Sequence, residues 1–277
     1  MPGQYLNIPI RSDRLSQTVF VKSRVFLRRS RFQSIEIFDT EAYGKVLTLD
    51  GHIQLTELDE HAYHEALVQV PLLSIAEPKA ALVVGGGDGG AIRELCKHAN
   101  LAHIDMVEID AAVIEACSTL LPGVSDGAFE DKRVKVHVAD AFAFVKKTDG
   151  PYDLIVVDST DTYENEKGAL SEQLFTSEFF ADCRRLLAPG GFLVTQADNP
   201  VFCPYSMAAI LSLLKGCFPR TGRYHAVIPS FGGFSGFVWA GNGAVLRAKW
   251  SEIDATGVSL SYLNEATYNF ALAPLPF

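Results

Sequence analysis

Short apolar runs alternate with amphipathic stretches over most of the chain, and this alternation limits the folds that it can adopt. The apolar runs, each about the length of one buried strand, are residues 80–84, 104–107, 134–138, 154–157, 192–195 and 224–228. The stretches between them that have helical length and spacing are residues 91–97, 111–120, 141–147, 178–187 and 204–217. Strands that alternate with helices predict an α/β fold with a doubly wound, mostly parallel sheet.

The first part of the chain follows a different pattern, which predicts strands alone. Its segments rich in Val, Ile and Phe are residues 17–26, 32–38 and 45–49, with turn residues between them. From Glu57 the apolar residues fall at helical spacing, with Thr56 as a candidate N-cap. We therefore predict a small N-terminal antiparallel β domain over residues 1–56 and a larger α/β domain over residues 57–277.

Charge and cysteine content narrow the classes of partner and compartment. The chain carries 33 acidic and 24 basic residues, a net charge of −9, which argues against binding to nucleic acid or to an anionic membrane. Its 5 cysteines form no CxxC pair, so we expect free thiols in a reducing compartment. Residues 1–11 have no apolar leader, and residues 224–246 are interrupted by Pro229 and several glycines. We expect a soluble, cytoplasmic protein.

Acidic side chains follow three successive strands of the predicted sheet. The turn GGGDGG at residues 85–90 contains Asp88, the next strand ends at Glu108, and the third is followed by Asp140. In nucleotide-binding folds of this kind, such acids bind ribose hydroxyls and adenine at the carboxyl edge of the sheet. Each acid alone could instead be the N-cap of the following helix. A carboxylate beside a pyrophosphate would repel it, so Asp88 disfavours NAD and favours a cationic adenosyl sulfonium compound.

The fourth strand ends in DSTD, which places Asp158 and Asp161 three positions apart over the same edge. An amine acceptor is protonated at neutral pH and becomes nucleophilic only when it loses a proton. One carboxylate can accept that proton, and a second can hold the cation. A turn or a helix N-cap is the alternative interpretation of DSTD.

These motifs together resemble the spermidine synthase family of polyamine aminopropyltransferases. The segments that carry the resemblance, in family order, are YHE at residues 63–65, GGGDGG, VEID at 107–110, DSTD and IPSFGG at 228–233. The resemblance implies a class I S-adenosylmethionine-binding fold. It also implies decarboxylated S-adenosylmethionine as donor, a diamine such as putrescine as acceptor, and spermidine and methylthioadenosine as products. No separate cofactor and no metal are implied, and a homodimer or homotetramer is typical.

The resemblance also implies roles for individual residues. Asp158 would accept the proton, Asp161 would hold the acceptor amine, and Tyr63 would contact the reacting nitrogen. The residues implied to bind the donor are Gln33, His64, Asp88, Glu108, Asp140 and Ala141. The further contacts expected in the substrate site are Gln54, Gln196 and Phe231.

Two departures from the family leave the acceptor open. No proline follows Asp161, and the loop after it is longer and carries Glu164, Glu166 and Glu172. Phe231 stands where the family has a tyrosine, so a hydroxyl near the acceptor is missing. Agmatine, cadaverine or a longer polyamine are therefore alternatives to putrescine.

Two other classes of function remain as alternatives. A class I methyltransferase would share the glycine-rich turn, but Asp88 would repel the carboxylate of S-adenosylmethionine. A binding protein without activity would not need the two acids of DSTD. A metal site at His61 and His64 is disfavoured because their order with Glu60 and Glu65 differs from HExxH.

Overall fold

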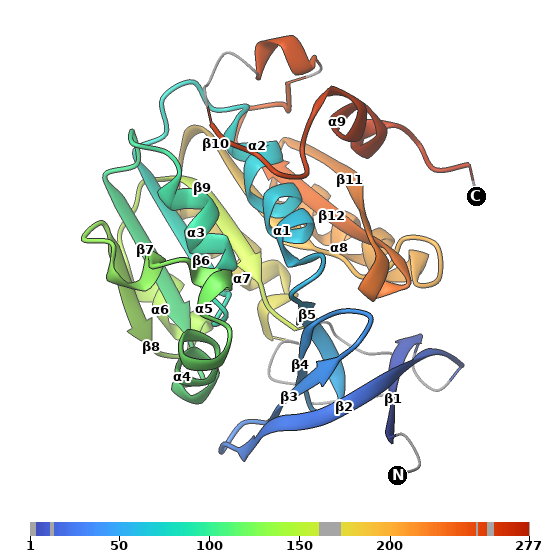
Figure 1. Ribbon diagram of the computed structural model, residues 1–277. Coiled ribbons are helices and arrows are strands. Elements are labelled where there is room, and N and C mark those ends of the chain that lie inside the picture. The colour runs from blue at the N-terminus through green and yellow to red at the C-terminus, as the bar shows by residue number, and fades with distance from the viewer. Residues whose placement is uncertain (1–3, 12–13, 161–172, 248, 254–257, 277) are drawn as a thin grey trace.

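The computed structural model describes residues 4–11, 14–160, 173–247, 249–253 and 258–276. It consists of a small N-terminal sheet packed against a larger α/β body, with the small sheet below the body in Figure 1.

The N-terminal sheet is an antiparallel meander in which every strand pairs with its neighbour in sequence. Its strands are β1 (Gln4–Arg11), β2 (Leu15–Arg29), β3 (Ser34–Thr40), β4 (Lys45–Leu49) and β5 (His52–Thr56). Asp50 and Gly51 connect β4 to β5 with φ angles of 49° and 83°, the left-handed conformation that a tight two-residue hairpin requires. Apolar side chains such as Ile37 and Leu47 pack on helix α4 (Ala111–Leu120) of the larger body.

The larger sheet has the strand order β11-β12-β10-β9-β6-β7-β8. The strands from β10 to β8 are parallel, and β12 is antiparallel to both of its neighbours. The bounds are β6 (Ala80–Gly85), β7 (His103–Glu108), β8 (Val134–Val138), β9 (Tyr152–Asp158), β10 (Leu187–Gln196), β11 (Arg220–Ile228) and β12 (Gly233–Gly241). The order reverses between β6 and β9, and such a switch point is where open α/β sheets bind ligands.

Helices cover both faces of this sheet and enclose two separate apolar clusters. One face packs against α1 (Glu60–His64), η1 (Glu65–Gln69), α2 (Val70–Leu72), α3 (Gly90–Cys96) and α9 (Glu265–Leu272). The other packs against α6 (Ala141–Lys147), α7 (Ser177–Leu186) and α8 (Pro204–Cys217). The short elements α5 (Pro122–Ser125), η2 (Ala128–Glu130), η4 (Pro229–Phe231) and η5 (Trp250–Glu252) lie in connections.

The C-terminal segment is held by a buried carboxylate. Glu65 accepts hydrogen bonds from the backbone N–H groups of Ser261, Tyr262 and Leu263, at 2.6, 2.9 and 2.9 Å. Three donors satisfy a charge that has no exposed surface. The segment that leads into α9 is thereby fixed to η1.

The fold class predicted from the sequence is confirmed, including the antiparallel N-terminal strands and the mostly parallel sheet. The predicted N-cap at Thr56 is wrong. Thr56 ends β5, the residue at the N-cap position of α1 is Asp59, and the Thr56 hydroxyl donates to Asp59 Oδ1 at 2.6 Å. All five cysteines are free thiols. Within the described part of the chain, none of the helices has both the length and the apolar character needed to cross a membrane.

Candidate active site

A pocket opens between the carboxyl ends of β6, β7 and β9 and the N-terminal sheet. The residues expected from the sequence that line it are Gln33, Gln54, Tyr63, Asp88, Glu108, Asp140, Ala141, Asp158, Gln196 and Phe231. His64 does not line it. Asp161 and the acids of its loop, Glu164, Glu166 and Glu172, lie outside the described residues.

The glycine-rich turn brings the strand ends close together. A Cβ on Gly85, which has a φ of 81°, would lie 2.2 Å from the carbonyl oxygen of Asp158. The N–H of Gly86 donates to that same oxygen at 2.9 Å. A Cβ on Gly87 would lie 3.1 Å from Glu108 Oε2. The glycines therefore allow three strand ends to meet at the pocket.

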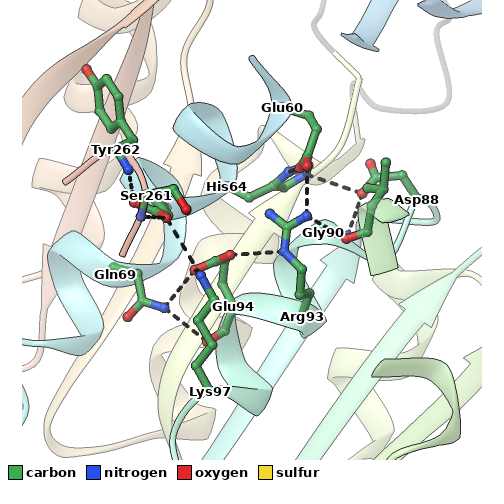
Figure 2. Close-up of polar contacts among 12 residues, drawn as sticks. Glu60, His64, Gln69, Asp88, Gly90, Arg93, Glu94, Lys97, Ser261 and Tyr262 are labelled. Carbon is green, nitrogen blue, oxygen red and sulfur yellow. Dashed lines mark hydrogen bonds and ion pairs between the residues drawn. The ribbon is translucent and has the colours of Figure 1, made fainter. Parts of the chain in front are cut away.

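Asp88 lines the pocket, and its side chain is paired with that of His64, which does not line the pocket. Figure 2 shows the contact between the two side chains. His64 Nε2 lies 3.2 Å from Asp88 Oδ1, and Nδ1 lies 2.8 Å from Glu60 Oε2. Burial alone would lower the pKa of His64, but the two carboxylates raise it to about 10. Burial would raise the pKa of Asp88, but the charge and hydrogen bond of His64 leave it below its ordinary value. Asp88 is an ionised carboxylate paired with an imidazolium.

His64, Asp88 and Asp158 also offer ligand atoms within 4.8 Å of one another, a spacing that could hold a metal ion. A histidine binds a metal through a ring nitrogen that carries no proton. Both ring nitrogens of His64 are already engaged by carboxylates. The arrangement therefore favours a proton over a metal at His64.

Glu108 and Asp140 lie farther along the same edge. Burial, together with the charges of Asp110 and Asp88, raises the pKa of Glu108 to about 7, although backbone N–H donors oppose the rise. Asp140 Oδ1 accepts from Phe142 N at 2.9 Å and caps α6, while the residue still lines the pocket. The cap and the pocket position are therefore compatible.

Gln33 reaches this edge from the N-terminal sheet. Its amide Nε2 donates to Asp110 Oδ2 at 3.1 Å, and Asp110 also caps α4. Gln196, at the end of β10, donates to the Ser159 carbonyl at 2.9 Å. Both amides are thus oriented by the protein before any ligand binds.

Asp158 and Tyr63 also line the pocket, and they contact each other. The Tyr63 hydroxyl donates to Asp158 Oδ1 at 2.8 Å, and Oδ2 is buried with no hydrogen-bond partner among the described residues. Burial and the nearby charge of Asp88 raise the pKa of Asp158 to about 6. The Tyr63 ring packs edge-on against Phe231, with ring centroids 5.5 Å apart. Asp158 therefore has one oxygen positioned by Tyr63 and a second, buried oxygen with no hydrogen-bond partner among the described residues.

Some neighbours of the site were not expected from the sequence. Glu60 and Arg93 support His64, and the spacing of Glu60 four residues before His64 on a helix was the available signal. Asp59 accepts from the backbone N–H and the hydroxyl of Ser230 at 2.8 and 2.9 Å, which fixes η4 beside the pocket. No local pattern points to that contact, because the two residues lie far apart in the sequence.

Comparison with known proteins agrees with this geometry. A family model described as a spermine/spermidine synthase domain matches residues 60–248, and one described as a spermidine synthase tetramerisation domain matches residues 8–57. The polyamine aminopropyltransferases of Escherichia fergusonii and Escherichia coli O1:K1 are each 38% identical over 269 residues, which cover 94% of this chain and 91% of theirs.

Solved structures are similar over nearly the whole chain. A crystal structure of spermidine synthase in complex with the transition-state analogue AdoDATO has a TM-score of 0.91 at 26% identity, covering 99% of this chain and 93% of that one. Spermidine synthase from Thermotoga maritima has a TM-score of 0.88 at 26% identity, covering 99% and 92%.

Proposed function

We propose, from the premise that this chain belongs to the spermine/spermidine synthase family of polyamine aminopropyltransferases, that it transfers the aminopropyl group of decarboxylated S-adenosylmethionine to putrescine. The products would be spermidine and methylthioadenosine. The observation that carries the proposal is Asp158, a buried base held by Tyr63 in the same pocket as the ionised Asp88.

The charge of Asp88 supports the choice of donor. The aminopropyl end of decarboxylated S-adenosylmethionine carries an ammonium, and the undecarboxylated compound carries a carboxylate beside it. An ionised Asp88 attracts the first and repels the second, and this opposition provides specificity. Gln33, Glu108, Asp140 and Ala141 would contact the ribose and the adenine.

The environment of Asp158 supports the chemical step. The acceptor nitrogen attacks the propyl carbon next to sulfur, so that a C–N bond forms while the C–S bond breaks. The electron pair of that C–S bond stays with sulfur, which leaves as neutral methylthioadenosine. The proton lost by the nitrogen passes to Asp158, whose pKa of about 6 suits a base near neutral pH. As proposed, the step uses no metal and no separate cofactor, and rests on positioning and deprotonation.

The acceptor is the part of the proposal with a specific alternative. Phe231 lines the pocket against Tyr63 and offers no hydroxyl. An apolar contact there would also suit cadaverine, agmatine or a longer polyamine, with the same chemistry at Asp158. Gln196 would supply a polar contact, and Asp161 would hold the acceptor amine.

Assembly and compartment complete the proposal. Phe20 and Leu27 expose apolar surface on β2, within the segment matched by the tetramerisation model, and Tyr5 exposes apolar surface on β1 just before that segment. This supports a homodimer or homotetramer, which light scattering would test. The free cysteines support a cytoplasmic location.

Methylthioadenosine release from the purified protein tests the function. The donors are decarboxylated S-adenosylmethionine and S-adenosylmethionine, each with putrescine, cadaverine, agmatine and spermidine. We expect release from the decarboxylated donor with putrescine, and loss of release in Asp158→Asn. Release with another amine alone would move the function to that acceptor. No release with any amine, despite donor binding, would refute the enzyme activity proposed.

A further inference from the structure

A buried series of alternating charges leads away from Asp88 toward the C-terminal segment, as Figure 2 shows. Its members, in order, are Asp88, His64, Glu60, Arg93, Glu94, Lys97 and Glu65. The part nearest the pocket is almost closed to solvent, since the side chains of His64, Glu60 and Arg93 are 1%, 10% and 12% exposed. Burying charged groups costs desolvation free energy, so ion pairs at this depth call for a structural or functional reason.

We propose that Glu60 and Arg93 are positioning residues for the donor, which hold a doubly protonated His64 behind Asp88 and so direct one oxygen of Asp88 to the aminopropyl ammonium. This inference rests on the proposed function for the identity of the ligand. The protonation of His64 does not depend on that identity.

The contacts of His64 require both ring nitrogens to carry a proton. Nδ1 lies 2.8 Å from Glu60 Oε2 and Nε2 lies 3.2 Å from Asp88 Oδ1. An ionised carboxylate only accepts hydrogen bonds, so each nitrogen must donate. The carboxylates around His64 are Glu60, Asp88 and Asp158, and the positive group nearby is Arg93. The Tyr63 ring packs against the His64 ring. This surplus of carboxylates stabilises the imidazolium.

Arg93 fixes Glu60. Its Nη1 donates to Glu60 Oε1 at 2.8 Å and to the Val124 carbonyl at 2.7 Å, and its Nε donates to Glu94 Oε1 at 3.1 Å. The guanidinium is therefore held by acceptors from three places. Glu60 divides its two oxygens between Arg93 and His64, so it cannot rotate without losing one of them.

These contacts make the two oxygens of Asp88 different from each other. Oδ1 accepts from His64 Nε2 and from Gly90 N, at 3.2 and 2.7 Å. Both of these contacts fall on Oδ1, so Oδ2 is the oxygen that remains for the donor. The ring of His64 occupies the space over Gly90, where a Cβ would lie 2.2 Å from its Cε1. The last glycine of GGGDGG, Gly90, therefore leaves room for the His64 ring.

Calorimetric titration of two ligands tests the proposal. Decarboxylated S-adenosylmethionine carries the ammonium, and methylthioadenosine has the same nucleoside without it. In Glu60→Gln we expect the affinity for the first to fall about tenfold, the effect of weakening one charge-assisted contact, while the affinity for the second stays within about twofold. Glu77→Gln, the same change at a side chain 79% exposed, is the control and should alter neither. An equal loss for both ligands, or no loss for the first, would overturn the positioning role.

Nitrogen NMR of the histidines tests the same proposal in the wild-type protein, whether or not Glu60→Gln folds. The signal of His64 is assigned by its absence in His64→Gln. We expect both ring nitrogens to be protonated at pH 8.5, because the pKa of His64 is about 10. A neutral ring that titrates near pH 6.5 would overturn the inference. If the wild type bound the two ligands equally, the proposed donor would be refuted while this result on His64 would still stand.

Discussion

Tyr63→Phe is the sharpest test of the roles assigned to Asp158 and Tyr63. The change removes one oxygen and keeps the ring, whose packing against Phe231 and Phe237 needs no hydroxyl. The change removes the hydrogen bond from the Tyr63 hydroxyl to Asp158 Oδ1, at 2.8 Å. That bond stabilises the ionised form of Asp158, so its loss raises the pKa of this carboxyl and makes it a base only at higher pH.

The size of the effect follows from the strength of the bond. A hydrogen bond to a charged group contributes about 1.5–3 kcal/mol, and water that enters the space replaces part of it, so the lower end applies. Since 1.36 kcal/mol corresponds to one pKa unit, the acid limb of the pH profile should move from about pH 6 to about pH 7. The ratio of kcat/KM for Tyr63→Phe to that of wild type should then fall about fivefold between pH 8 and pH 6.

The assay is kcat/KM for the donor between pH 5 and pH 9 at a fixed, saturating amine concentration. The ionisation of the amine is the same for both proteins and cancels in the ratio. Tyr5→Phe removes a hydroxyl from a tyrosine on β1 that does not line the pocket, keeps its ring, and serves as the control. Parallel pH profiles for wild type and Tyr63→Phe would refute the assignment of the acid limb to Asp158.

Two further changes test neighbouring parts of the site. Asp88→Asn removes the charge that is proposed to select the donor, so the ratio of affinities for decarboxylated over intact S-adenosylmethionine should fall by about tenfold, as measured by calorimetry, and an unchanged ratio would contradict the charge argument. Gly90→Ala places a Cβ 2.2 Å from the His64 ring and should cost about 1–3 kcal/mol, lowering Tm by several degrees in scanning calorimetry. Gly123→Ala, where a Cβ meets no atom within 4 Å, should leave Tm close to that of wild type. Equal Tm values for the two variants would show that the His64 ring tolerates a Cβ at position 90.

Much of the fold could be predicted because its signals are local. Buried parallel strands need short apolar runs, and the runs at 80–84 and 154–157 became β6 and β9 almost without change. Glu108 ends its strand and Asp140 lies just past the end of its own, so the strand order alone brings both to one edge. The strand arrangement accounts for the pocket positions of these two acids, whereas Gln33, Gln54, Tyr63, Gln196 and Phe231 were implied by the resemblance to the family.

The contacts of α1 could not be predicted in the same way, because they depend on how the helix packs across the strand ends. Helical spacing predicts that His64 lies on a helix. It does not predict that the side chain pairs with Asp88 and does not line the pocket. Thr56 was expected to cap α1, yet its hydroxyl bonds the Asp59 side chain, which in turn holds Ser230. Partners so far apart in the sequence leave no local signal. The domain limits and the role of Asp161 stay predictions.

The pKa values of the two pocket acids Asp88 and Asp158 are shifted in opposite directions. His64 keeps Asp88 ionised, and burial together with that same Asp88 charge raises the pKa of Asp158 to about 6. A cationic donor bound at Asp88 would cancel the charge that opposes the ionisation of Asp158. Donor binding should therefore lower the pKa of Asp158 and leave it ready to accept a proton when the amine arrives. The acid limb of kcat, which reports the donor complex, should then lie below the acid limb of kcat/KM, which reports the free enzyme. Acid limbs at the same pH would mean that Asp88 does not bind the positively charged group of the donor.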